Sequence, residues 1–242
     1  MSAIDRVKVL VLGDSGVGKT SFVHLAAHNE PLRSPSWTVG CSVEVKLHEY
    51  KEGTKEQKTY FIEFWDVGGS QIHRNARPVF YHPCHGAILV HDLTNRKSEE
   101  NLHKWVKEIV NKRERKDSGS HLSISISSPN TNHLNEDWDQ ESIFGNPTVP
   151  FLVIGTKLDQ VDDKKSHLSQ IACDLTADEI VLDSRQVRYL AAGTSNAVKL
   201  SRFLDKVIET RAKAHKDSFS ERFGSNPISP ILSTKFYSPH QD

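Results

Sequence analysis

The stretch Gly13-Asp14-Ser15-Gly16-Val17-Gly18-Lys19-Thr20 follows directly on the apolar run Val7 to Leu12. It matches the pattern G-x-x-x-x-G-K-[ST], in which a glycine-rich turn joins a buried strand to a helix. The glycines let backbone N–H groups curl around a phosphate, the lysine reaches the β- and γ-phosphates, and the threonine hydroxyl is a ligand for Mg²⁺. The sequence therefore predicts a phosphate-binding loop whose nucleotide contacts are Asp14, Ser15, Gly16, Val17, Gly18, Lys19, Thr20 and Ser21.

A second motif follows the stretch Tyr60 to Trp65, in which apolar and polar residues alternate. The residues Asp66-Val67-Gly68-Gly69 fit the pattern D-x-x-G. In such a motif the aspartate reaches Mg²⁺ through a water molecule, and the glycine N–H contacts the γ-phosphate. We expect these roles for Asp66 and Gly69.

A third motif, Thr156-Lys157-Leu158-Asp159, ends the apolar run Phe151 to Ile154 and points to the base. The Asp159 carboxylate can accept hydrogen bonds from N1–H and the exocyclic amine of guanine, while the Lys157 stem covers the ring. Adenine leaves the carboxylate unpaired, which discriminates strongly between the two bases. Thr156, Lys157 and Asp159 are therefore predicted nucleotide contacts, and an ATP-using kinase is disfavoured.

Apolar runs of strand length alternate with helical patterns along the chain. Val7 to Leu12, Ile88 to His91 and Phe151 to Ile154 are almost continuously apolar, which is typical of parallel strands covered on both faces. Cys41 to Tyr50 and Tyr60 to Trp65 alternate instead and predict an antiparallel hairpin at one sheet edge. We expect an α/β fold with a mostly parallel six-stranded sheet, one antiparallel edge strand and helices on both faces.

Two stretches carry apolar residues at helical spacing. The first lies behind an expected N-cap at Ser98 and includes Leu102, Trp105, Val106, Ile109 and Val110. The second includes Ala197, Leu200, Phe203, Leu204, Val207 and Ile208. Both are predicted to face the core.

The composition excludes several classes of partner. Lys and Arg together number 31, as do Asp and Glu, so the basic excess that nucleic acid binding usually requires is missing. Three cysteines at unrelated spacings fit neither a disulfide framework nor a four-ligand zinc site. The sequence shows no signal peptide, membrane span, or myristoyl or prenyl acceptor. We expect a cytoplasmic protein with no lipid anchor and no nucleic acid partner.

The order of motifs resembles the Ras superfamily of small GTPases, over about residues 5–112 and 150–212. In that family a threonine 18 residues after the P-loop hydroxyl caps the γ-phosphate and Mg²⁺, and Thr38 stands at that spacing from Thr20. The resemblance implies a P-loop GTPase fold (G domain), GTP or GDP with Mg²⁺, and Thr20, Thr38 and Asp66 (through water) at the metal. It also implies that Lys19, Thr38 and Gly69 are the catalytic residues.

The boundaries of the domain, the insertion and the tail follow from composition and from that resemblance. Residues 1–215 are expected to form one G domain, with a polar insertion at about 113–150 that we interpret as mobile. Residues 216–242 are rich in Ser and Pro and are expected to form a C-terminal tail.

Within the superfamily the chain is most similar to Rab proteins, which share the P-loop sequence and the stretch Leu89 to Asn95. It departs from them in lacking C-terminal cysteines, in having Val67-Gly68-Gly69-Ser70 for the usual Thr-Ala-Gly-Gln, and in having Thr156 for Asn. With the insertion before the fifth strand, these features resemble the atypical branch called Rab-like protein three. Rho-type GTPases also use Thr-Lys-x-Asp, but their insertion follows that motif.

The last base-binding loop of the family, Ser-Ala-Lys after the sixth strand, has two candidates in this chain. Glu179 to Asp183 is expected to be that strand, which makes Asp183 and Ser184 the positional candidates for contacting the guanine oxygen through backbone N–H groups. Ala192-Gly193-Thr194, just before the last helix, is the alternative.

Ser70 stands where most family members carry the glutamine that orients the attacking water. A serine side chain is too short for that role, so the resemblance implies slow hydrolysis. Gln71 lies one residue late, and Arg74 or Arg77 are candidates for adding charge.

Two functions from different classes remain open at this point. One is a GTP/GDP switch that binds regulatory or effector proteins. The other is a GTP-stabilised interaction module that forms a homodimer or holds other small GTPases or their chaperones.

Overall fold

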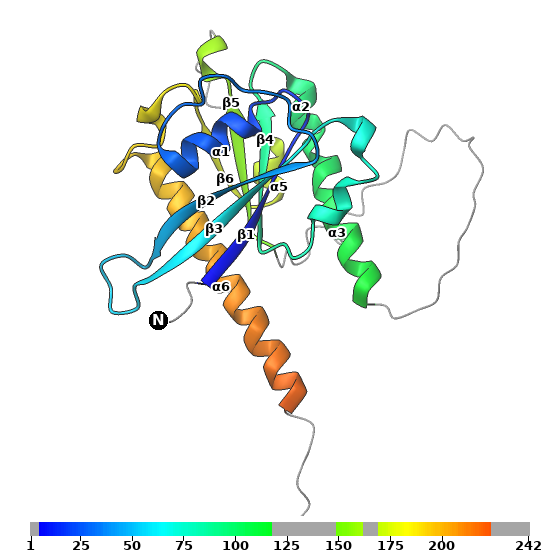
Figure 1. Cartoon of the computed structure of the whole chain (residues 1–242), viewed down its shortest axis with the longest axis vertical. Helices are drawn as coiled ribbons and strands as arrows, with labels where there is room; N and C mark the ends of the chain where they lie inside the picture. The colour runs from blue at the N-terminus through cyan, green and yellow to red at the C-terminus, as the bar shows by residue number, and fades with distance from the viewer. Residues whose placement is uncertain (1–4, 118–148, 162–168, 224–242) are drawn as a thin grey trace, which may run out of the picture.

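The computed structural model describes residues 5–117, 149–161 and 169–223 and forms one sheet of six strands in the order β2-β3-β1-β4-β5-β6 (Figure 1). The strands are β1 (Asp5–Leu12), β2 (Cys41–Tyr50), β3 (Lys58–Val67), β4 (Gly86–Asp92), β5 (Phe151–Thr156) and β6 (Asp178–Val181). Only β2 and β3 pair antiparallel, at the β2 edge, and the other neighbours are parallel. The predicted fold class is confirmed.

Helices cover both faces of this sheet (Figure 1). They are α1 (Lys19–His28), α2 (Arg96–Glu100), α3 (Leu102–Asp117), α5 (Gln170–Asp174) and α6 (Ser195–Phe223). Short 3₁₀ helices lie between them, namely η1 (Gln71–His73), η2 (Arg77–Phe80), η3 (Leu158–Gln160) and η4 (Val187–Tyr189).

The core is divided into two layers by the sheet, because successive side chains of a strand point to opposite faces. Val7, Val9 and Val11 of β1 pack in one layer with side chains of α1 and α6. Leu10 and Leu12 pack in the other layer with α3 and α5. The predicted core face of α6 is confirmed for five of its six residues, which are buried: Leu200, Phe203, Leu204, Val207 and Ile208. Ala197, at the start of the helix, is only partly buried.

The prediction that Ser98 caps a single long helix is wrong. Two helices, α2 and α3, meet at Asn101, and Asn95 occupies the N-cap position of α2. Ser98 lies inside α2 and is completely buried, where its hydroxyl accepts a hydrogen bond from the Asp92 N–H (2.9 Å) and donates one to the Asn95 carbonyl (2.6 Å). The serine therefore ties α2 to the end of β4 instead of capping a helix.

The predicted insertion and tail fall mostly outside the described residues. Helix α3 continues to Asp117, inside the expected insertion 113–150, and residues 118–148 are not described. Helix α6 runs through position 216 to Phe223. None of the helices in the described part of the chain combines the length and apolar character needed to cross a membrane.

Candidate nucleotide site

A cavity of about 300 Å³ lies where β1 leads into α1. The residues that line it come from the predicted phosphate loop, from a later loop, and from the segments that follow β3 and β5. The lining residues are Ser15, Gly16, Gly18, Lys19, Thr20, Ser21, Pro35, Ser36, Trp37, Thr38, Gly69 and Lys157. The three motifs, far apart in sequence, thus meet at one place.

Lys19 lies beneath the predicted phosphate loop. Its ammonium donates hydrogen bonds to the carbonyls of Gly13 (2.9 Å) and Asp14 (2.8 Å), and the residue is 6% exposed. Burial lowers the pKa of Lys19 to about 8, and although Asp66 and Asp14 oppose this shift, Arg77 adds to it. A bound polyphosphate would supply the negative charge that this buried cation lacks.

Asp14 fixes the position of the loop. Its carboxylate accepts hydrogen bonds from Asn101 Nδ2 (2.7 Å) and Trp105 Nε1 (3.0 Å). Both donors come from the junction of α2 with the first turn of α3. The Asp14 carboxylate is therefore hydrogen bonded within the protein. The motif pattern gives no sign of these two partners, because they lie far along the chain.

Three oxygen-bearing side chains meet at the start of α1. Thr20 Oγ1 lies 3.0 Å from Thr38 Oγ1, and both hydroxyls hydrogen bond to Asp66 Oδ2, at 2.5 and 3.1 Å respectively. Asp66 is completely buried, burial raises the pKa of its carboxyl, and its Oδ1 has no hydrogen-bond partner among the described residues. An unpartnered carboxylate oxygen beside two hydroxyls fits the all-oxygen ligand set of Mg²⁺.

Gly69 lies directly against the phosphate loop. A Cβ atom added at this position would fall 2.5 Å from Gly13 O and from Ser15 N. Any other residue would therefore push the end of the D-x-x-G motif away from the loop.

Thr156 is buried behind the phosphate loop. Its hydroxyl lies 2.5 Å from the Val17 carbonyl and 3.0 Å from the His91 carbonyl, so it joins β5 to both the loop and β4. This position links elements and does not line the cavity in the described residues. The position of Thr156 therefore allows it to support the phosphate loop.

We expect Thr156→Val to lower the free energy of unfolding by about 1–3 kcal/mol, since the shape is kept while the one hydroxyl proton shared by two buried carbonyls is lost. Chemical denaturation of the two proteins measures this difference. Thr156→Ser is the matched control, because it keeps the hydroxyl. A valine variant as stable as the serine variant would contradict the structural role of this hydroxyl.

Lys157 lies between the cavity and the end of β4. Its backbone is left-handed (φ 59°), and its ammonium pairs with Asp92 Oδ2 at 2.6 Å. Burial opposes ionisation of Asp92, but the hydrogen bonds from Lys157 and Thr94 outweigh it and hold the pKa of that carboxyl below its usual range. The pair holds the lysine stem along the cavity wall.

Asp159 lies in η3 beside the loop that follows β6. Its Oδ2 accepts a hydrogen bond from Arg185 Nη2 at 2.5 Å, and the Leu158 N–H donates to the Leu182 carbonyl (3.3 Å). Sequence reasoning missed Arg185, although its place after Asp183-Ser184 corresponds to the lysine of the family's Ser-Ala-Lys loop.

Asp183 holds the shape of that loop. Its carboxylate accepts hydrogen bonds from the Arg185 N–H (2.9 Å) and from Gln186 Nε2 (2.6 Å). Although burial opposes it, these donors keep the pKa of Asp183 below its usual range. Ser184 is also buried, and its hydroxyl has no hydrogen-bond partner in the described part of the chain.

The alternative stretch Ala192-Gly193-Thr194 has a different use in the structure. Thr194 Oγ1 accepts a hydrogen bond from the Ala197 N–H (3.2 Å) at the start of α6. This contact is a helix N-cap. The loop at Asp183 and Ser184, by contrast, lies beside Asp159.

Residues after Gly69 turn away from the cavity lining. Gln71 accepts a long hydrogen bond from Arg77 (3.4 Å), and both Arg77 and Arg74 face Glu108, at 3.5 and 3.4 Å. Arg77 is 1% exposed and lies 4.2 Å from the centre of the Trp105 ring. Neither arginine lines the cavity.

Known proteins of similar sequence belong to the same superfamily that the order of the motifs indicates. Residues 8–119 match the Roc family, described as the Ras of Complex, Roc, domain of DAPkinase. The chain is 53% identical over 220 residues to Rab-like protein 3 of Homo sapiens, covering 87% of this chain and 88% of that protein. It is 49% identical over 235 residues to Rab-like protein 3 of Danio rerio, covering 92% and 95%. The small GTPase LIP1 of Arabidopsis thaliana is 39% identical over 113 residues, covering 43% of this chain and 33% of that protein.

Identity of about half, over most of both chains, is far above what unrelated proteins share. The predicted resemblance to Ras-superfamily GTPases and to their Rab-like branch is confirmed. Such a family binds guanine nucleotides and hydrolyses GTP. The chain belongs to the Rab-like protein 3 family of small GTPases.

Proposed function

We propose that this protein is a slowly hydrolysing GTP/GDP switch that uses Mg²⁺ and acts in intracellular signalling or trafficking. The observation that carries the proposal is the meeting of Thr20, Thr38 and Asp66 oxygens beside Lys19 and Gly69. On GTP binding, Thr38 and Gly69 would hold two loops against the γ-phosphate. Hydrolysis would release them and change the surface that effectors or regulators recognise.

The predicted site residues contact the nucleotide or the metal ion in this proposal, except Thr156, which supports the phosphate loop. Residues 14–21 hold the phosphates, with Lys19 as the cation. Thr20 and Thr38 would hold Mg²⁺ directly and Asp66 would hold it through water, and the ion would supply positive charge for the β- and γ-phosphates. Asp159 reads the guanine edge, Lys157 covers the ring, and the backbone at Asp183 and Ser184 contacts the guanine oxygen.

Slow hydrolysis is proposed because Ser70 cannot reach an attacking water and because Gln71 is engaged by Arg77. We expect GTP conversion in single-turnover experiments with Mg²⁺ to take hours. Ser70→Gln should raise the rate at least about tenfold, since it restores a side chain that can orient water.

Gln71→Ala is the matched control for this experiment. It removes an amide one residue away, and we expect it to leave the rate within about twofold of wild type. If Gln71→Ala reduced the rate more than Ser70→Gln raised it, Gln71 would be the water-orienting residue and the proposal of slow turnover through Ser70 would fail.

A second function, a GTP-held interaction module, is favoured by apolar side chains exposed near the cavity. Trp37 is 82% exposed, Val39 80%, and Ile72 88%. Such a surface suits a partner such as a second copy of this chain, another small GTPase or its chaperone. GTP retained unhydrolysed after purification, with a dimer in light scattering, would favour this function over a cycling switch.

We also propose that residues 1–215 act as one G domain with 216–242 as a C-terminal tail, in a cytoplasmic protein. Cys41, Cys84 and Cys173 form no disulfide among the described residues, which supports a reducing compartment.

A further inference from the structure

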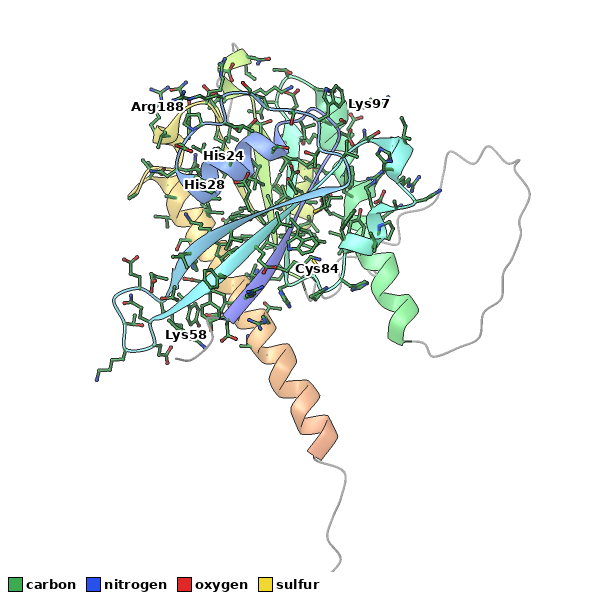
Figure 2. The ribbon with its side chains drawn as sticks, in the orientation of Figure 1. His24, His28, Lys58, Cys84, Lys97 and Arg188 are labelled. Carbon is green, nitrogen blue, oxygen red and sulfur yellow. The ribbon has the colours of Figure 1, made fainter. Side chains whose placement is uncertain are left out.

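Two histidines of α1 lie next to a glutamate of β2, on a part of the surface that the nucleotide cavity does not include. His24 and His28 are four residues apart and therefore lie on the same face of the helix, as Figure 2 shows. Their ring centroids are 4.7 Å apart. Glu44 faces them from the neighbouring strand.

Both carboxylate oxygens of Glu44 lie near an imidazole nitrogen. His28 Nε2 is 2.9 Å from Oε2, and His24 Nδ1 is 3.5 Å from Oε1. One ligand atom from each of the three residues can be chosen so that all lie within 4.8 Å of one another. Ligands about 2.1 Å from a tetrahedral zinc ion lie roughly 3.4 Å apart, so the observed spacings are close to those of a bound ion.

The contact between His28 and Glu44 is not a hydrogen bond. Glu44 Oε2 is buried and has no hydrogen-bond partner in the described residues, although His28 Nε2 is only 2.9 Å away. A buried carboxylate oxygen without a donor is unfavourable. A cation placed between the oxygen and the ring nitrogen would satisfy the lone pairs of both atoms.

Neighbouring side chains hold this arrangement in place. Lys46, two residues along the same face of β2, donates a hydrogen bond to the Ala26 carbonyl of α1 (3.0 Å) and so fixes the strand against the helix. Glu30 Oε1 lies 3.6 Å from His24 Nε2, on the other side of the ring from Glu44. A carboxylate behind a metal-binding histidine orients the ring and sets which nitrogen carries the proton.

We propose that His24, His28 and Glu44 form a binding site for a divalent transition-metal ion, with Zn²⁺ as the best match. Two imidazoles and one carboxylate suit zinc, and three protein ligands leave a position for water. The site would join the end of α1 to the edge strand β2, at the start of the loop that carries Thr38. It stands apart from the proposed nucleotide chemistry.

The test is titration of the full, untagged chain with Zn²⁺ against a chromophoric chelator, with saturating Mg²⁺ and GDP to occupy the nucleotide site. We expect one Zn²⁺ per chain and a rise in the unfolding temperature. His28→Gln and Glu44→Gln should each weaken binding at least about tenfold. His73→Gln, which changes an exposed histidine outside the cluster, is the matched control.

A second readout does not depend on the variants. In NMR spectra of the wild-type chain, one equivalent of Zn²⁺ should shift the ring signals of His24 and His28 together and leave that of His73 unchanged. Failure to bind one equivalent, or binding weakened equally by His73→Gln, would overturn the proposal.

Discussion

Replacing Lys19 by alanine is expected to lower GTP affinity at least about 100-fold. The ammonium is the buried cation beside the cavity, and it is already oriented by the carbonyls of Gly13 and Asp14. A charge-assisted hydrogen bond contributes about 1.5–3 kcal/mol, and the lysine would make such bonds to two phosphates. Loss of these hydrogen bonds costs about 3 kcal/mol or more of binding free energy, which corresponds to the expected fall in affinity of at least about 100-fold.

The same substitution should lower the stability of the nucleotide-free protein less than that of the nucleotide-bound protein. The pKa of Lys19 is about 8, below its value of 10.5 in an unfolded chain, so the charged form is disfavoured by folding. This unfavourable contribution is fully present below pH 8 and fades as the pH rises toward 10.5. At pH 7 removing the side chain relieves it, which offsets part of the cost of losing the hydrogen bonds to the Gly13 and Asp14 carbonyls. The nucleotide-bound protein, which also loses the contacts to the phosphates, should therefore lose more thermal stability than the free protein.

Lys8 provides the matched control, since it is another buried lysine whose pKa is lowered by burial. Its ammonium donates to the Phe80 carbonyl (2.6 Å) and lies over the Trp65 ring, outside the cavity lining. Lys8→Ala should destabilise the free and bound forms alike. Equilibrium titration with fluorescent GDP and GTP measures both variants, and a Lys19→Ala protein with wild-type affinity would contradict the phosphate-loop assignment.

The sequence could predict the sheet because the strand signals are local. Continuous apolar runs mark the parallel strands, and alternation marks the β2–β3 hairpin. The break between α2 and α3 was missed because it depends on Ser98, whose hydroxyl hydrogen bonds to the end of β4, a tertiary contact. A serine before acidic residues looks the same in sequence whether it caps a helix or lies inside one.

Motif spacing located the candidate phosphate and metal residues, because their geometry follows from short loops at strand ends. It could not locate Asn101 and Trp105, which hold Asp14 from another part of the chain. The sequence also gives no sign that His24 and His28 form a cluster, because Glu44 lies near them only through the packing of α1 on the edge strand β2. Contacts between elements far apart in sequence have no local signature.

Replacing Asp159 by asparagine is expected to invert the preference between guanine and xanthine nucleotides. A carboxylate accepts from N1–H and from the exocyclic amine of guanine, whereas asparagine offers one acceptor and one donor. Xanthine has a carbonyl in place of that amine and so matches asparagine. A polar group of a binding site that is left without its partner discriminates by up to about 10⁴-fold, and we expect GTP affinity to fall at least about 100-fold.

Asp183→Asn separates this effect from a general loosening of the base loop. The Asp183 carboxylate is already used by the Arg185 N–H and by Gln186, within its own loop. Loss of this carboxylate should lower the affinity for guanine and for xanthine nucleotides by a similar factor. The ratio of the two affinities should therefore stay unchanged.

The measurement is competition of GTP and XTP for each variant against a labelled nucleotide. Arg185 adds a second effect, because its guanidinium donates a hydrogen bond to Asp159 Oδ2 at 2.5 Å. Guanine must displace that donor or share the carboxylate with it, and asparagine would hold Arg185 less strongly because it has no charge. If Asp159→Asn kept wild-type selectivity for GTP, the base would have to be read elsewhere, and the backbone at Ser184 would be the next group to test.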